Sequence, residues 1–146
     1  MTATAALERT LHDEIPLTRA MGLRVASYDH NCLRLSAPLA ANINHKSTAF
    51  GGSLYSLAVL CGWGMVHLKL AEAGLHKHIV IQDAKISYLL PVDGEMQAAC
   101  SLDEVALHNF LHALIKQGRA RLELKVAIQH NGQNAVEFSG RYVVHS

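Results

Sequence analysis

The part of the chain best equipped for chemistry is the run Asn-His-Lys-Ser-Thr-Ala-Phe-Gly-Gly-Ser-Leu, from Asn44 to Leu54. A polar loop leads here into Gly51 and Gly52, which open a long apolar segment that predicts a buried helix. The first turn of a helix has unpaired backbone N–H groups and a partial positive charge. Because glycine lets a ligand approach the backbone closely, this helix start could stabilise a carbonyl oxygen or an anion.

Each polar side chain of this run has a functional interpretation and a structural one. Asn44 can donate its amide to a substrate carbonyl, or it can satisfy the backbone of its own loop. Ser53 can contact substrate or bond to the helix backbone, and Thr48 can contact substrate or cap the helix. His45 and Lys46 can attract a carboxylate or a phosphate, or they can be solvated loop residues.

Outside this run, few residues suggest chemistry. Asp83 stands in an otherwise apolar strand, where it is either part of a salt bridge at an interface or a candidate base for hydrolysis. The pairs His76 and His78, and His108 and His112, have spacings that could bind a metal. No cysteine or carboxylate cluster joins them, so we expect surface histidines and no metal site.

Composition limits the possible functions. The 146 residues suit one domain, 1–146, and the net charge of +1 favours no nucleic-acid or membrane partner. Cys32, Cys61 and Cys100 are widely spaced and odd in number, which predicts free thiols in a reducing compartment. The N-terminus lacks the pattern of a signal peptide, and the apolar stretch 54–66 is too short to span a bilayer. We therefore expect a cytoplasmic protein.

Hydrophobic periodicity and turn signals predict an α+β fold in which an antiparallel sheet wraps one long helix. Gly62 and Gly64 lie inside that helix, where we expect the sheet to pack closely. A capping box is predicted from Ser101 to Glu104, and a helix stop at Gly118. The predicted elements, in order, are a helix at 4–20, strands at 23–29 and 32–37, a loop at 38–49, the central helix to about 73, strands at 79–90 and 95–101, a helix to 118, a strand at 120–129 and a final strand after the Asn131-Gly132 turn.

At this point the chain resembles a hotdog-fold protein of the thioesterase superfamily. The resemblance covers nearly the whole chain and includes the run 44–54, the helix after it, the strand end 86–91 and the Gly118-Arg119-Ala120 segment. Within the superfamily it most resembles a bacterial group of thioesterase-like proteins that has been reassigned to malonyl-acyl-carrier-protein decarboxylation. For this chain the resemblance implies a hotdog fold, no cofactor, and an acyl thioester as substrate.

The sequence departs from hotdog thioesterases in an informative way. Many of them carry His-Gly-Gly at the helix start, and Phe50 replaces that histidine here. Many also carry an acid within the helix, whereas the segment from Ser53 to Ala71 has none. Hydrolysis needs a base to activate water. Decarboxylation of a malonyl thioester needs no base, only stabilisation of an enolate and a poorly solvated carboxylate, so the sequence favours it.

The resemblance also implies partners and contacts. A homodimer or a dimer of dimers would close the sheet edge, and an acyl carrier protein or coenzyme A would carry the acyl group. Hydrolysis of an acyl thioester and non-catalytic binding of one are the two alternatives. The candidate catalytic residues are Asn44, Gly51, Gly52 and Ser53; the candidate substrate contacts are His45, Lys46, Thr48, Phe50, Asp83 and Tyr88; and the candidate carrier contacts are Lys116, Arg119 and Arg121.

Overall fold

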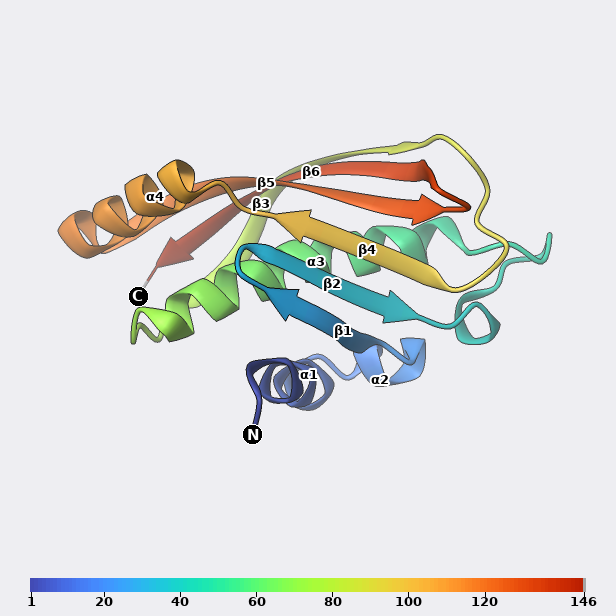
Figure 1. Cartoon of the computed structure of the whole chain (residues 1–146), viewed down its shortest axis with the longest axis horizontal. Helices are drawn as coiled ribbons and strands as arrows, with labels where there is room; N and C mark the ends of the chain where they lie inside the picture. The colour runs from blue at the N-terminus through green and yellow to red at the C-terminus, as the bar shows by residue number, and fades with distance from the viewer. Residues whose placement is uncertain (146) are drawn as a thin grey trace.

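A long helix, α3 (Gly51–Glu72), runs through the middle of the molecule with a six-stranded sheet wrapped along it (Figure 1). The computed structural model describes residues 1–145. Every paired neighbour in the sheet is antiparallel, and the strand order is β1-β2-β4-β5-β6-β3. This arrangement is the predicted hotdog fold. The elements, in order, are α1 (Ala3–Glu14), α2 (Leu17–Met21), β1 (Arg24–Asp29), β2 (Cys32–Ala37), η1 (Ala40–Asn42), α3, β3 (His78–Tyr88), β4 (Met96–Ser101), α4 (Glu104–Gln117), β5 (Arg119–His130) and β6 (Gln133–His145).

Three details of the predicted elements are wrong, each for a local reason. The helix predicted at 4–20 is two helices, because Pro16 cannot continue α1 and instead begins α2. The helix α4 is capped by Asp103, whose carboxylate accepts the Ala106 N–H at 3.1 Å, and not by Ser101. The predicted loop at 38–49 contains the short 3-10 helix η1. Gly118 does end α4, in the left-handed conformation that glycine adopts easily.

The sheet packs against α3 so closely that two helix positions have room only for glycine. A side chain at Gly62 would overlap the ring and hydroxyl of Tyr142, a buried residue of β6. The Tyr142 hydroxyl donates to the Val59 carbonyl oxygen of α3 at 2.7 Å. At Gly64 a Cβ atom would lie 2.9 Å from Leu33 of β2. The expected close approach of helix and sheet is therefore confirmed.

The C-terminal end of α3 buries a charged residue. Lys69 is only 5% exposed, and its ammonium donates to Asn31 Oδ1 at 2.7 Å and to the His30 carbonyl at 3.2 Å. It also lies 3.4 Å from a Glu72 oxygen and over the Tyr28 ring. A buried charge is tolerated when it is hydrogen-bonded in this way. Lys69 therefore ties the end of α3 to the β1–β2 turn.

By length and composition alone, α3 could cross a membrane. However, 67% of its most apolar window is buried inside the protein, under the strands and α1. This burial is that of a core helix in a folded domain.

Candidate active site

The start of α3 leaves backbone donors open. Phe50 is the N-cap residue, with an extended backbone and no side-chain cap. The N–H groups of Ser53 and Leu54 both bond to the Phe50 carbonyl oxygen. The N–H groups of Gly51 and Gly52 meet no acceptor within residues 1–145. Two donors at the positive end of a long helix are therefore available to a ligand.

Two neighbouring segments fix this helix start. Asn42 is buried, and its side-chain amide donates to the carbonyl oxygens of Met21 and Pro38 at 2.9 and 2.8 Å. Its own carbonyl accepts the Phe50 N–H at 2.7 Å, and the Ala49 N–H donates to the Val92 carbonyl at 2.7 Å. The sequence analysis missed Asn42. Its signal was a single amide within the otherwise apolar segment 37–43, where a buried polar group needs partners.

Asn44 closes the loop before the helix. Its Oδ1 accepts the N–H groups of Lys46 and Thr48 at 2.8 and 3.1 Å. Its Nδ2 donates to Thr48 Oγ1 at 2.9 Å and to the Ala49 carbonyl at 3.4 Å. The structural role considered for Asn44 is therefore present. The longer bond, to Ala49, is the one that a substrate carbonyl oxygen could replace.

Thr48 does not cap the helix, because it lies two residues before the cap residue Phe50 and bonds to Asn44 instead. The Phe50 ring lies against Gly52, where any side chain would overlap it. The Ser53 hydroxyl makes no hydrogen bond within residues 1–145. The bond to the helix backbone that the sequence analysis offered as its structural role is therefore not made within those residues. His45 is an exposed loop residue.

Tyr88, the last residue of β3, lies beside the helix start. Its hydroxyl donates to the Gly51 carbonyl oxygen at 2.9 Å. Burial raises the pKa of the Tyr88 phenol, which keeps it protonated and able to donate. A cleft of about 290 Å³ opens here, and we call it the helix-start cleft. It is lined by Ala49, Gly51, Leu54, Tyr88, Leu89, Leu90, Pro91 and Val92.

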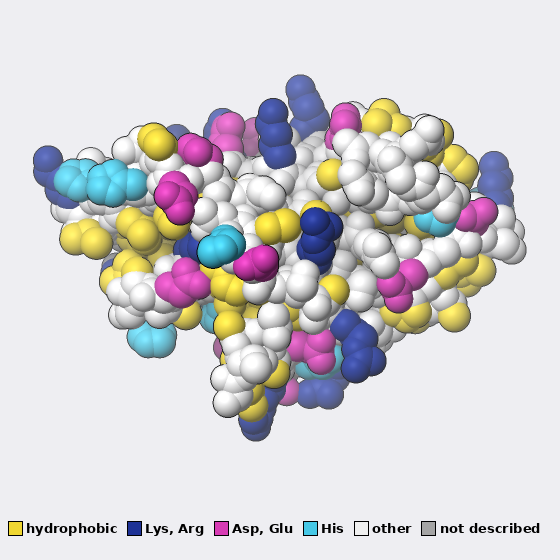
Figure 2. All heavy atoms as spheres, in the orientation of Figure 1, with side chains coloured by type: hydrophobic (Ala, Val, Ile, Leu, Met, Phe, Trp, Pro, Cys, Tyr) yellow, Lys and Arg dark blue, Asp and Glu magenta, His cyan; other side chains and the backbone are white. Residues whose placement is uncertain are grey.

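The lining of the helix-start cleft has no carboxylate, histidine or lysine. Large apolar side chains stand exposed around it: Phe50 is 57% exposed and Tyr88 52%. Ile43, Leu89 and Leu90 are exposed near them. Figure 2 shows hydrophobic side chains gathered at the right-hand end of the molecule, where the loop before α3 and the β3–β4 connection lie. A ligand there meets backbone donors, one phenol and apolar walls.

Other predicted site residues lie away from this cleft. Asp83 is exposed on the outer face of the sheet, beside Arg141 of β6, whereas the helix-start cleft faces α3. Asp83 therefore does not line the helix-start cleft of its own protomer. Lys116, Arg119 and Arg121 lie at the opposite end of the sheet, since Arg119 pairs with His145 and His145 with His78. These three cations therefore do not line the helix-start cleft of the same protomer.

The helix itself supplies no base to the cleft. Ala58 and Gly62, one stripe of α3 where an acid could be introduced, are buried against the sheet. The thiols of the core are also poor nucleophiles, because burial raises the pKa of Cys61 and raises that of Cys100 to about 12. Within residues 1–145, no three His, Cys, Asp or Glu side chains stand close enough together to hold a metal ion.

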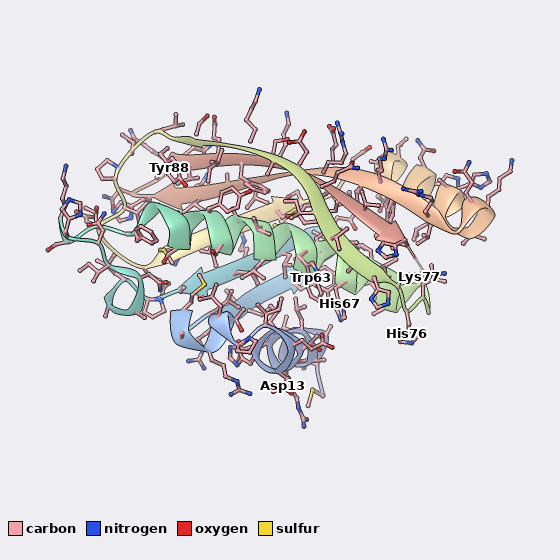
Figure 3. The ribbon with its side chains drawn as sticks, turned by 180° about the vertical axis from the view of Figure 1, so that it is seen from behind. Asp13, Trp63, His67, His76, Lys77 and Tyr88 are labelled. Carbon is pink, nitrogen blue, oxygen red and sulfur yellow. The ribbon has the colours of Figure 1, made fainter. Side chains whose placement is uncertain are left out.

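A second, larger cavity lies at the other end of β3. It measures about 600 Å³ and is bounded by the C-terminal half of α3 and the first residues of β3. Trp63 and His67, one helical turn apart, stack on its wall with ring centroids 5.1 Å apart. In Figure 3 these two residues lie beneath one end of β3, while Tyr88 marks the other end. We call this space the Trp63–His67 cavity.

Comparison with known proteins agrees with this fold. The model of the family described as "Putative thioesterase (yiiD_Cterm)" matches residues 4–146. The chain belongs to this family. A structure of a Chlorobaculum tepidum protein of unknown function is 37% identical, with a TM-score of 0.93, covering 98% of this chain and 94% of that one. A "putative thioesterase" from Shewanella oneidensis is 32% identical, with a TM-score of 0.91, covering 99% and 98%.

A Pseudomonas aeruginosa protein described as a probable thioesterase shares the fold at a TM-score of 0.84, with 21% identity and coverage of 98% and 95%. Membership of the family and the shared fold assign this chain to the hotdog thioesterase superfamily. The protein is therefore an enzyme that acts on acyl thioesters.

Proposed function

We propose that the reaction is decarboxylation of a malonyl thioester carried by an acyl carrier protein, giving the acetyl thioester that starts fatty-acid synthesis. The observation that carries this proposal is the helix-start cleft, which pairs open backbone donors with walls that lack any base. The thioester oxygen would accept the N–H groups of Gly51 and Gly52. The Asn44 amide would join them by exchanging its 3.4 Å bond to Ala49 for the substrate oxygen.

The steps balance without a catalytic base. The bond between the carboxylate carbon and Cα breaks, carbon dioxide leaves, and the electron pair moves into the thioester carbonyl. The resulting enolate oxygen is held by the helix-start donors, whose fixed orientation favours charge that develops there. The enolate carbon then takes one proton from water. The apolar side chains of Leu54, Leu89 and Leu90 would offer the substrate carboxylate no hydrogen-bond partner, which favours its loss.

Hydrolysis is the second candidate, favoured by the thioesterase description of the family. It needs a water molecule held and deprotonated near the thioester carbon. Among the residues that line this cleft, the one with an ionisable side chain is Tyr88, whose protonated phenol is not a good base at neutral pH. The cleft therefore supports decarboxylation better than hydrolysis.

The proposed partners and compartment are supported by the open sheet edge, the exposed apolar residues and the free cysteines. The edge strand β3 and the exposed apolar residues around the cleft favour a homodimer. The three cysteines are free, which favours a reducing compartment such as the cytoplasm. A carrier protein or coenzyme A would then deliver the malonyl group.

Product identity tests the proposed function. The protein is incubated with malonyl-carrier protein, and acetyl-carrier, free carrier and unchanged substrate are resolved by mass. We expect acetyl-carrier protein, with carbon dioxide released in equal amount. Free carrier protein would establish a hydrolase instead, and unchanged substrate that nevertheless binds would establish a non-catalytic acyl-thioester-binding module.

A further inference from the structure

The connection between β3 and β4, residues 89–95, forms one wall of the helix-start cleft and belongs to no helix or strand. Val92, at its middle, is completely buried, and its carbonyl oxygen accepts the Ala49 N–H at 2.7 Å. Ala49 directly precedes Phe50, the N-cap residue of α3. The position of this wall is therefore linked to the position of the helix start through a backbone hydrogen bond.

The two halves of the connection are held in different ways. In the first half, the N–H groups of Leu89 and Leu90 donate to the Ala135 carbonyl oxygen at 2.8 and 3.1 Å. In the second half, the Asp93 carboxylate bonds to His130 Nε2. Within residues 1–145, this side-chain pair is the hydrogen bond that ties the second half to an element other than the adjoining β4. The placement of this half therefore depends on one imidazole.

His130 is held firmly by its own surroundings. It is the last residue of β5 and pairs with Gln133 across Asn131 and Gly132, whose φ angles of 53° and 76° fit a tight hairpin turn. Its side chain is 17% exposed and lies against the connection, where a Cβ atom at Gly94 would be 3.2 Å from Cε1. In Figure 1 this hairpin end lies beside the connection, at the end of the molecule where α3 begins. The imidazole is thus a fixed point for the wall.

The chemistry of the pair suits the holding of a position. An ionised carboxylate only accepts hydrogen bonds, so the His130 Nε2–H donates to Asp93. A hydrogen bond to an ionised group is stronger than one between neutral groups. Neither residue lines the helix-start cleft. Any effect of the pair on a substrate would therefore act through the wall.

We infer that His130 is a positioning residue: by holding Asp93 it fixes the wall of the helix-start cleft and limits the size of the acyl group accepted beside the α3 donors. One extra methyl group on the α-carbon of a malonyl thioester would need space that the fixed wall does not give. A misfit of this size in an apolar pocket changes specificity by about 10–200-fold. The inference rests on the proposed function for the identity of the acyl group, whereas the fixing of the wall does not depend on the reaction.

The ratio of kcat/KM for malonyl-carrier protein to that for methylmalonyl-carrier protein tests the inference. A variant that is only partly folded lowers both values equally and leaves this ratio unchanged. We expect the parent to favour malonyl by about tenfold or more, and His130→Ala to lower the ratio by about threefold or more, because the wall can then move away from the α-carbon. His130→Gln keeps an N–H donor near the position of Nε2 and should restore the parent ratio.

Two further variants complete the comparison. Asp93→Ala removes the other partner of the pair, whose side chain is 71% exposed, and should lower the ratio as His130→Ala does. It replaces His130→Ala if that variant does not fold. Glu123→Ala is the matched control, because it breaks an ion pair with Arg141, at 3.2 Å, away from the connection. Its ratio should equal that of the parent.

Amide hydrogen exchange measures the wall without any substrate. The Ala49 N–H is protected by its bond to the Val92 carbonyl oxygen. This N–H should exchange faster in His130→Ala than in the parent, because the wall that accepts it opens more often, and should exchange at the parent rate in Glu123→Ala.

Four results would overturn the inference. They are an unchanged ratio in both His130→Ala and Asp93→Ala, equal ratios in His130→Gln and His130→Ala, a parent that shows no preference for malonyl, and Ala49 exchange that does not respond to His130→Ala. If the parent decarboxylates neither substrate, the proposed function fails, and Ala49 exchange alone then decides whether His130 fixes the wall.

Discussion

Asn44→Asp is expected to lower the turnover of malonyl thioester by about 10²–10³-fold, the usual cost of losing one oxyanion donor. The substitution removes the amide hydrogens that the proposed function directs at the substrate carbonyl. It keeps a carboxylate oxygen where Oδ1 now accepts the N–H groups of Lys46 and Thr48. The loop should therefore stay closed, and the thermal midpoint should stay near that of the parent.

Two control variants distinguish the loss of the Asn44 amide donor from a disturbance of its loop and from the effect of the added negative charge. Thr48→Val removes only the Oγ1 acceptor of the Asn44 amide and should leave activity within a few-fold of the parent. Ser47→Asp places the same charge at an exposed position of the loop without removing the amide. Steady-state rates at equal enzyme measure all three. If the rate of the Asn44→Asp enzyme is within threefold of the parent rate, Asn44 has only a structural role in its loop.

Gly62→Ala is expected to lower the free energy of unfolding by about 3 kcal/mol, from overpacking and the loss of a buried hydrogen bond. The new methyl group would occupy the position of the Tyr142 hydroxyl, which donates to Val59. Tyr142 is buried within the sheet and has no space to retreat. For this reason the gain in helix propensity from alanine cannot compensate.

Chemical denaturation followed by circular dichroism checks this prediction, with Gly51→Ala as the matched control. A Cβ atom at Gly51 would lie 3.5 Å from the Tyr88 ring, which is an ordinary contact. The control should therefore unfold at the same denaturant concentration as the parent. A Gly62→Ala protein as stable as the parent would mean that the helix and the sheet are not packed as described.

The sequence predicted the order of helices and strands well because the strands alternate and α3 is apolar on nearly all sides. It also predicted the glycine pair at the helix start and the close contact at Gly62. It could not assign the cap of α4 to Asp103, since Ser101 and Asp103 both fit the local pattern. The prediction also joined α1 and α2, because it followed the apolar periodicity through Pro16 and did not use the break that proline indicates.

The site was harder to predict, because the sequence does not say which residues meet in space. Asp83 was placed in a strand, but its face of the sheet was decided by the bulge between Ile81 and Asp83. The basic residues near Arg119 lie at the far end of the sheet, and only the strand register shows this. The partners of Asn42 and the cavity beside Trp63 and His67 depend on long-range packing, which the local sequence around these residues does not specify.

The central claim is that the helix-start cleft stabilises an enolate and does not activate water. The most direct measurement compares malonyl and butyryl groups on the same carrier protein at equal enzyme, recording acyl-carrier mass and free thiol together. The account predicts that malonyl-carrier becomes acetyl-carrier with little free thiol, and that butyryl-carrier, which has no carboxylate to expel, is scarcely changed. Free thiol released from butyryl-carrier as fast as malonyl-carrier is consumed would contradict it.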